Sequence, residues 1–325
     1  MTDNLRHPSV DLRGRQPACQ QVSTPPTAVC PSFSPEKEVR GGYLLITPAC
    51  NEEHNIGRML TSVLAQKVLP RKWIIVDDGS TDRTAEIVEQ YAREHPFIEL
   101  IHFPRRQTRL PGGENAVNRV LRQTDVSCYE FFSRFDADLV LEPDYISRIL
   151  GEFRRDKRLG IAGGGLYIQK NARLELEEVP EYHVRGALKM YRHECFKDLG
   201  GLESCIGWDT IDEVSAWIKG WTTRSFVQYR VIHLRPTGEG IRARHLYWQR
   251  GKAEYYTWSH PFFVLCKAVK IAFSKAGLVP AICLLGGFGL CYLKCEERLD
   301  DPQFRKARRD QQIRRIFAIG GKEML

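Results

Sequence analysis

The sequence lacks the two glycine-rich motifs that most readily identify phosphate-binding loops. No GxGxxG follows the first apolar segment, which leaves a dinucleotide-binding fold of the usual kind poorly supported, and GxxxxGK[ST] is absent from the 325 residues. The ten cysteines are irregularly spaced and include no CxxC pair, which argues against a disulfide framework. No apolar segment of the secretory type is present near the start, so we expect a reducing, cytoplasmic setting.

Positive charge is concentrated in one part of the chain. The formal net charge is +8, and residues 222–275 alone carry ten Lys or Arg against two Glu, a net charge of +8 for that segment. Such a segment calls for a phosphate, an anionic bilayer or a nucleic acid as its partner. Long apolar runs lie beside the positive charge, and no RNA-binding or DNA-binding motif is present, so we expect no nucleic-acid partner.

The composition divides the chain into three regions. Residues 1–40 are rich in Pro, Ser, Thr, Gln and Arg without hydrophobic periodicity, which predicts a disordered leader. Residues 41–240 alternate apolar segments with amphipathic ones, predicting strands at 43–47, 72–78, 98–103 and 128–136 and helices at 53–66, 82–95 and 114–123. This alternation is typical of an α/β fold with a mixed, mostly parallel sheet between helices. Residues 241–325 read as a helical, basic and apolar extension.

Polar residues follow three of the predicted strands. The first strand leads into PACNEE, the second into DDGSTD and the fourth into DAD. Ligands of such sheets bind at the carboxyl ends of the strands, so we expect an acidic crevice there. In DAD, Asp136 and Asp138 would repel each other, and each would disfavour ionisation of the other. Either a positive group lies between them or both face water.

Three motifs in fixed order resemble the inverting family 2 glycosyltransferases of the exopolysaccharide or cell-surface glycan type, which have the GT-A fold. They are TPACNEEHNIGRMLTSVLAQ, IIVDDGSTDRTAEIVEQYA and RFDADLVLEPDYI. Each motif alone is moderately specific, whereas the ordered set is strong, and the resemblance covers roughly residues 43–235. It implies transfer of a sugar from a nucleotide-diphosphate sugar, foremost a UDP-sugar, to a hydroxyl of a lipid-linked or polysaccharide acceptor.

The resemblance also implies roles for individual residues. At the first strand end, Pro48, Asn51 and Glu52 would line the pocket for the base and ribose. At the second, a carboxylate of Asp77 or Asp78 would accept a hydrogen bond from the base. Asn118, on the helix before DAD, would also contribute to binding of the nucleotide-sugar. Asp138 would bind a divalent cation, Mg²⁺ or Mn²⁺, with Asp136 nearer the ribose or the same metal and His233 close by. A solvated surface pair and a structural histidine are the competing interpretations.

The general base of such a reaction would lie in LGGLESCIGWDTIDEVSAWIKGW, residues 199–221. The family usually has ED or TED, whereas this chain has WDTID. Counting back from Gly220 favours Asp209, while the similarity of TID to TED favours Asp212, and Glu213 is third. We favour Asp209, although an aspartate there could instead cap the helix. The departure from the family motif leaves a catalytically silent nucleotide-sugar-binding or membrane scaffold protein as the alternative.

The last third of the chain combines lysines, aromatic residues and apolar runs. Residues 261–273 are apolar except for Lys267 and Lys270, a pattern of interfacial helices, and residues 276–293 contain eighteen residues without a charge. A re-entrant or buried core helix competes for the second segment. Residues 305–316 predict a basic helix that could lie on anionic lipid. We expect a protein at the cytoplasmic face of a membrane, either peripheral or with one short C-terminal membrane segment.

Overall fold

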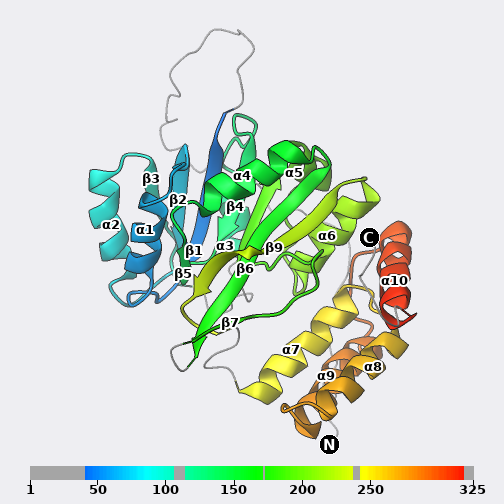
Figure 1. The fold of residues 1–325 in the computed structure, drawn as a ribbon. Helices are drawn as coiled ribbons and strands as arrows, with labels where there is room; N and C mark the ends of the chain where they lie inside the picture. Colours follow the sequence, from blue (N-terminus) through cyan, green and yellow to red (C-terminus); the bar gives the residue numbers. More distant parts are fainter. Residues whose placement is uncertain (1–40, 106–113, 171–172, 237–241, 318–325) are drawn as a thin grey trace, which may run out of the picture. The chain divides into compact units, whose positions relative to one another are not determined.

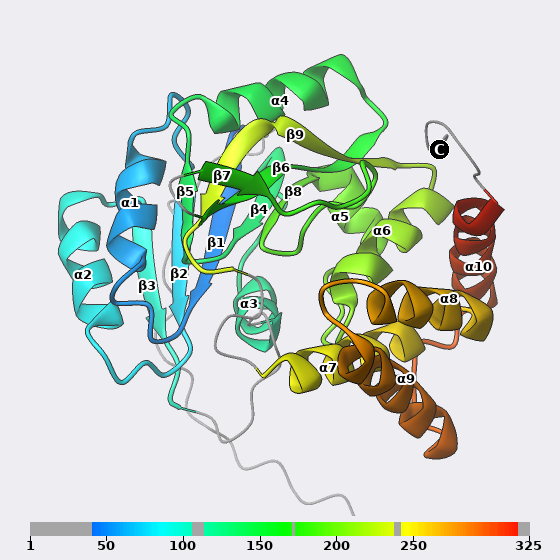
Figure 2. The same cartoon turned by 60° about the horizontal axis from the view of Figure 1, so that its bottom comes forward.

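The computed structural model describes residues 41–105, 114–170, 173–236 and 242–317 (Figure 1). The predicted leader, residues 1–40, lies outside the described residues. The described part contains the predicted mixed α/β architecture, followed by four helices near the C-terminal end (Figure 2).

The sheet begins with a parallel group in the order β3 (Ile98–His102), β2 (Lys72–Asp77), β1 (Tyr43–Ala49) and β4 (Phe131–Phe135). It continues through β8 (Leu188–Arg192), β6 (Leu159–Lys170), β9 (Thr222–His233) and β5 (Leu139–Leu141), and β7 (Arg173–Leu176) pairs with β6. β8 runs antiparallel to both β4 and β6, whereas β6 and β9 are parallel. The sheet is therefore mixed, with its parallel group at the N-terminal half of the domain.

Helices cover both faces of this sheet. α1 (Ile56–Leu64), α2 (Thr84–Glu94) and α4 (Tyr145–Arg155) pack on one face, and α3 (Glu114–Leu121), α5 (His193–Leu199) and α6 (Trp208–Ile218) pack on the other. Along β1, Tyr43 and Leu45 face the first layer, while Leu44 and Ile46 face the second. A strand buried on both faces needs a continuous apolar run, which is why YLLI precedes the polar strand end.

Four helices follow the sheet: α7 (Ala243–Tyr256), α8 (Pro261–Ala272), α9 (Leu278–Leu293) and α10 (Pro302–Phe317). α9 packs tightly against α7, and Phe304 of α10 is buried against Ile211 and Val214 of α6. The uncharged segment 276–293 thus becomes α9, a helix of 16 residues. Within the ranges that the structure describes, no helix is both long enough and apolar enough to cross a membrane.

Candidate functional site

The polar segments that follow β1 and β2 are hydrogen-bonded to each other. Asn51 has a left-handed backbone with φ of 55°, a conformation that asparagine tolerates better than most residues. Its amide donates to Ser80 Oγ over 3.0 Å, and its side-chain Oδ1 accepts from the Thr81 amide over 2.8 Å. Pro48 is thus the next-to-last residue of β1, and Asn51 follows the strand and is bonded to the DDGSTD turn.

The two aspartates that end β2 are both buried. Asp77 is fully buried; its Oδ1 accepts from the Ser80 amide over 2.9 Å, and its Oδ2 lies 2.6 Å from His102 Nδ1. The amide of Asp78 donates to Ala49 O over 2.9 Å, which ties the end of β2 to the end of β1. Asp77 therefore fixes the shape of the turn, and both residues belong to the same strand-end group as Asn51.

An arginine joins the carboxylates at the ends of β1 and β4. Arg235 donates through Nη2 to Glu52 Oε1 and, over 3.1 Å, to Asp138 Oδ2. Glu52 also accepts from Asn55 Nδ2 over 2.8 Å, and its own amide donates to Thr84 Oγ1 over 2.8 Å. Arg235 thus places a guanidinium beside Asp138, and its side chain is 44% exposed.

His233, at the end of β9, supplies a second cation to Asp138. Its Nε2 lies 3.7 Å from Asp138 Oδ2 and its Nδ1 lies 3.0 Å from Glu177 Oε2. Burial acts to lower the pKa of His233, but the carboxylates of Asp138 and Glu177 outweigh it and raise the pKa to about 9. Burial likewise acts to raise the pKa of Asp138, yet the bond to His233 and the charges of His233 and Arg235 lower it.

Asp136 is paired with a different arginine, Arg134. Its Oδ1 lies 3.0 Å from Arg134 Nη2, and its amide donates to Ala187 O over 2.9 Å. The surrounding protein raises the pKa of Asp136 by burial, and Arg134 opposes this shift. Arg134 also donates to Gly186 O, and its guanidinium carbon lies 4.8 Å from the centroid of the Trp208 ring. The two aspartates of DAD are therefore held by different arginines.

Asp209 lies in the first turn of α6, close to the same segment. A Cβ built on Gly186 would lie 3.3 Å from Asp209 Cβ, so Asp136 and Asp209 both adjoin residues 186–187. The side chain of Asp209 is 31% exposed, and its Oδ2 lies 3.9 Å from His183 Nε2. Burial acts to lower the pKa of His183, but Glu213 and Asp209 raise it. Gly207, rather than an aspartate, occupies the N-cap of α6.

Asp212 and Glu213 point into the protein instead. Lys189 Nζ donates to Asp212 Oδ1 over 2.7 Å and lies 3.2 Å from Glu213 Oε1, while Tyr191 OH donates to Asp212 Oδ2 over 2.5 Å. Glu213 also accepts from the Val184 amide over 2.7 Å. Burial raises the pKa of Asp212 to about 7, although Lys189 opposes this. We call Lys189, Tyr191, Asp212 and Glu213 the buried cluster.

Asn118 lies on α3 and is bonded to the loop that precedes α6. Its Nδ2 donates to Leu202 O over 3.0 Å and to Ser204 Oγ over 2.6 Å. These bonds hold the chain that leads into Asp209. The structure therefore gives Asn118 a position from which it supports the α6 side of the site.

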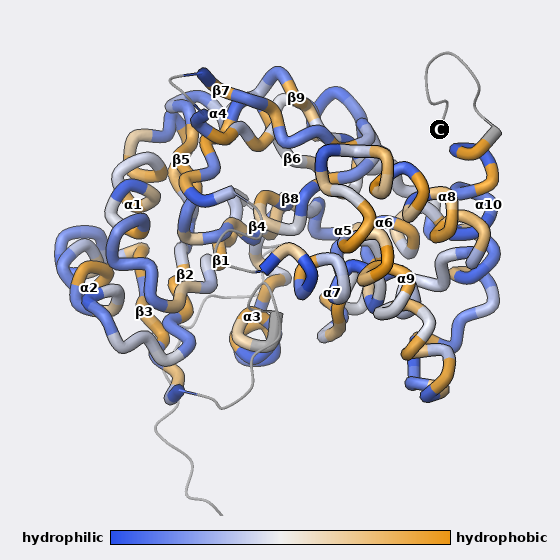
Figure 3. The backbone as a smooth tube through the Cα atoms, turned by 90° about the horizontal axis from the view of Figure 1, so that it is seen from below, coloured by the Kyte–Doolittle hydropathy of each residue, from blue (hydrophilic) through white to orange (hydrophobic). Residues whose placement is uncertain are grey.

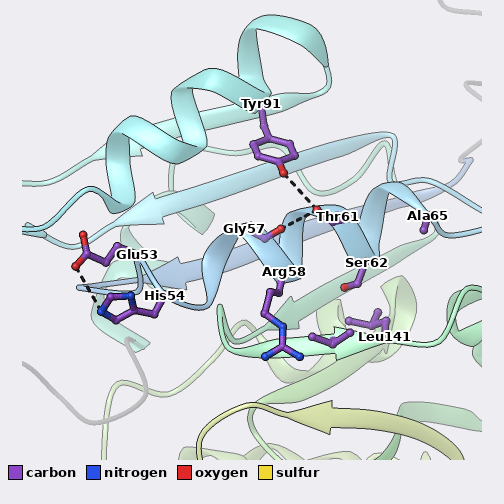
Figure 4. A pocket seen from close by; sticks show the side chains of 10 residues that line it. Glu53, His54, Gly57, Arg58, Thr61, Ser62, Ala65, Tyr91 and Leu141 are labelled. Atoms are coloured by element: carbon purple, nitrogen blue, oxygen red, sulfur yellow. Dashed lines mark hydrogen bonds and ion pairs between the residues drawn. The ribbon is translucent and has the colours of Figure 1, made fainter.

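Two hollows among the described residues are not lined by the carboxylates of the DAD motif. One is an open groove of about 590 Å³ along α1, lined by residues such as Arg58, Tyr91 and Leu141 (Figure 4). The other, of about 790 Å³, lies where Trp217 and Thr222 approach α10. Neither is lined by Asp136, Asp138 or Asp209, so the candidate site is defined by its polar contacts.

Sequence reasoning missed several partners of these residues. Lys189, Tyr191 and Glu177 carried no recognisable signal, because each lies far along the chain from the group it contacts. Arg134 did carry one: it is a charged residue within an otherwise apolar strand, two positions before Asp136. A buried cation in a strand implies a paired anion, so Arg134 could have been paired with DAD.

A mixed sheet with polar residues gathered at its strand ends defines an α/β domain of the ligand-binding class. Residues 44–199 match the family model described as glycosyl transferase family 2. Residues 44–199 are therefore a glycosyltransferase domain of family 2, which confirms the resemblance over that part of the chain. Asp209 and His233 lie outside the matched residues.

Curated relatives agree with this family. A poly-beta-1,6-N-acetyl-D-glucosamine synthase of Staphylococcus epidermidis is 24% identical over 206 residues, covering 62% of this chain and 48% of the relative. The synthase of the same name from Staphylococcus aureus strain COL is 23% identical over 198 residues, covering 60% and 46%. The chain thus spans about half the length of the curated relatives it matches.

Solved structures similar to this chain include a mannosyltransferase and S. aureus TarS. The mannosyltransferase PcManGT from Pyrobaculum calidifontis, in complex with GDP-Man and Mn²⁺, is 19% identical with a TM-score of 0.49, and the match covers 86% of this chain and 76% of that one. S. aureus TarS 1-349 in complex with UDP is 18% identical with a TM-score of 0.46, covering 78% and 72%.

Proposed function

We propose that the protein transfers a sugar, with inversion, from a nucleotide-diphosphate sugar to a hydroxyl group of a lipid-linked or polysaccharide acceptor. A UDP-sugar is the first donor to test. The observation that carries this proposal is the grouping of Glu52, Asp136 and Asp138 at neighbouring strand ends, inside the segment that matches the family model. A partly exposed carboxylate, Asp209, adjoins residues 186–187, as Asp136 does.

In this proposal the nucleotide lies across the ends of β1 and β2. Asp77 keeps the turn in shape through Ser80 and His102, and the other residues line the pocket for the base and ribose; these are Pro48, Asn51, Glu52 and Asp78. Asn118 does not contact the nucleotide in this proposal but stabilises the loop that leads into α6.

A divalent cation, Mg²⁺ or Mn²⁺, fits the oxygen donors of Asp136 and Asp138, with His233 alongside. Among the described residues, no three His, Cys, Asp or Glu side chains converge on one cation position. Mg²⁺ usually binds to proteins through one or two carboxylates together with substrate phosphates. When bound, the cation would neutralise charge on the departing diphosphate. Arg235, which contacts Asp138, would then be available to a phosphate oxygen or to Glu52 alone.

Asp209 is proposed as the general base. A base must reach the acceptor hydroxyl, and among the acidic residues of α6 Asp209 is the one whose side chain is partly exposed, at 31%. Asp212 and Glu213 are both occupied within the buried cluster. His183 lies against Asp209 and orients its carboxylate from the protein side.

The acceptor class rests on the family and its relatives. The relatives matched here are named as polysaccharide synthases, which supports a growing glycan as acceptor. The positive segment 222–275 supports an encounter at an anionic membrane surface, on the cytoplasmic face, where lipid-linked acceptors would be met.

Calorimetric titration tests this proposal. The full chain is titrated with UDP, GDP and dTDP, each with and without Mn²⁺, and the series is repeated on Asp138→Ala and on Asp300→Ala, an exposed control. We expect one nucleotide to bind in a metal-dependent manner, with binding lost in the first variant and kept in the second. Absence of binding to all three would overturn the proposal. Binding without turnover on any acceptor would favour the catalytically silent alternative.

A further inference from the structure

α8 and α9 carry large apolar side chains on the faces that point to solvent. Phe273, at the turn between them, is 89% exposed, Leu278 at the start of α9 is 64% exposed, and Leu293 at its end is 85% exposed. Other exposed members recur every three to four residues; they are Phe262, Leu265 and Val269 on α8 and Val279, Ile282 and Leu285 on α9. We call these nine residues the outer face of the hairpin.

The opposite faces of the same helices are apolar as well. Val264 and Ala268 of α8 are buried with Leu284 and Phe288 of α9, around Tyr255 of α7. Helices at a protein surface in water normally carry polar residues on the side away from the core. α9 departs from this rule, because hydrophobic residues occupy most of its length (Figure 3).

Tight packing on α7 keeps the outer face of α9 turned outward. A Cβ on Gly251 of α7 would lie 2.1 Å from Leu284 O, and one on Gly287 of α9 would lie 2.2 Å from Trp248 O. Only glycine permits two helix backbones to approach so closely. Turning α9 about its axis would bring larger residues to these positions, so the outer face is held in place.

The charge around the hairpin has one sign. The chain contains no Asp or Glu between Glu254 and Glu296, a stretch that includes Lys267, Lys270 and Lys275. Lys267 is paired with Glu254, whereas Lys270 and Lys275, together with Lys294 at the end of α9, are exposed beside the outer face. Exposed apolar side chains bordered by lysine complement an anionic lipid leaflet. A second protein copy would instead have to accept the same positive charges on both sides.

We propose that the α8–α9 hairpin, residues 261–294, inserts its outer face into the headgroup–acyl boundary of an anionic lipid leaflet, with the turn at 273–279 entering first. This specifies how the enzyme of the proposed function is held at its membrane, and it rests on that function only for the choice of leaflet. The lysines stay at headgroup level while Phe273 and Leu278 enter the apolar layer.

Vesicle flotation of the full chain tests this inference without any sugar transfer. Vesicles of phosphatidylcholine with roughly 30% phosphatidylglycerol are compared with vesicles of phosphatidylcholine alone. We expect Phe273→Ser with Leu278→Ser to lower the partition coefficient at least about tenfold, since two large apolar side chains are lost. Lys270→Gln with Lys275→Gln should lower binding to the anionic vesicles roughly fivefold per residue. Leu69→Ser with Leu174→Ser, two exposed leucines elsewhere, is the matched control and should bind as the wild type.

The inference is overturned by absence of flotation of the wild-type protein, by flotation unchanged in the Phe273 and Leu278 variant, or by an equal loss in the control. A dimer in light scattering that Phe273→Ser dissociates would assign the face to a second copy instead. Nucleotide titration without vesicles runs in parallel. If no nucleotide binds but the protein still floats with the vesicles, the proposed sugar transfer is refuted while the proposed membrane contact is retained.

Discussion

The strand-end carboxylates and the buried cluster are both compact groups of acids, but they are neutralised in different ways. Asp212 and Glu213 share Lys189, whose side chain is fully buried. Glu52 and Asp138 share Arg235, whose side chain is 44% exposed. A fully buried ammonium group cannot change its position without disrupting the packing around it, whereas a partly exposed guanidinium can adopt another rotamer when a ligand binds. The exposure of the shared cation therefore distinguishes the buried cluster, which stabilises the fold, from the strand-end carboxylates, which we propose bind a ligand.

The largest expected effect separates two aspartates of α6. Asp209→Asn should lower the rate of transfer by about 10²–10⁴-fold, as loss of a general base does. Asp212→Asn should keep the rate within about tenfold of the wild type, because its side chain faces Lys189 and Tyr191. Turnover of both variants is measured at saturating donor, with circular dichroism as the check on folding. The reverse order of rates would make Asp212 the base and refute the distinction.

Removing the buried cation should damage the fold rather than the chemistry. Lys189→Met leaves Asp212 and Glu213 buried without their shared partner, a change that typically costs about 3–5 kcal/mol of unfolding free energy. Arg235→Met, at the exposed cation, should cost about 1 kcal/mol or less. Urea unfolding at neutral pH measures both values. Equal losses of unfolding free energy in the two variants would mean that Lys189 and Arg235 stabilise the fold to the same extent.

The pH dependence of stability sharpens the same contrast. Burial raises the pKa of Asp212 from its ordinary value of 3.8 to about 7, so the folded protein holds this proton more tightly than the unfolded chain. The resulting stabilisation is complete below pH 3.8, declines as the pH rises toward 7, and is gone above that value. Asp212→Asn should lack this decline, so the difference in stability between wild type and variant should fall as the pH rises from about 4 to 7. Urea midpoints at intervals across that range test it, and parallel curves for the two proteins would contradict it.

The apolar runs made β1, β2 and β3 predictable to within two residues at each end, because strands buried on both faces need such runs. β4 begins at Phe131 instead of residue 128, since residues 126–129 form a turn in which the Tyr129 amide donates to Val126 O over 3.3 Å. The strand-end acids were predictable for the same reason as the strands that they follow.

The cations that neutralise these acids were much harder to predict. Arg235 lies 97 positions from Asp138, and Lys189 lies 23 positions from Asp212, so no local pattern connects them. Such pairs depend on which strands become neighbours: β9 beside β5 brings His233 and Arg235 to DAD. Choosing between Asp209 and Asp212 likewise required the direction of each side chain, since both have the same residue type and lie within one turn of the same helix.

The smallest expected effect is that of Asn118→Ala, which tests whether Asn118 binds the nucleotide or stabilises the loop before α6. Its Nδ2 donates to Leu202 O and Ser204 Oγ, so Asn118→Ala should cost about 1 kcal/mol of unfolding free energy and about 2 °C in Tm. The nucleotide Kd should stay within about twofold, because these bonds hold the loop before Asp209 and not the ends of β1 and β2. Thermal unfolding and nucleotide titration are measured on the same preparation. A Kd weakened tenfold with an unchanged Tm would return Asn118 to the nucleotide pocket that the family resemblance implies, and the strand-end group would then extend to α3.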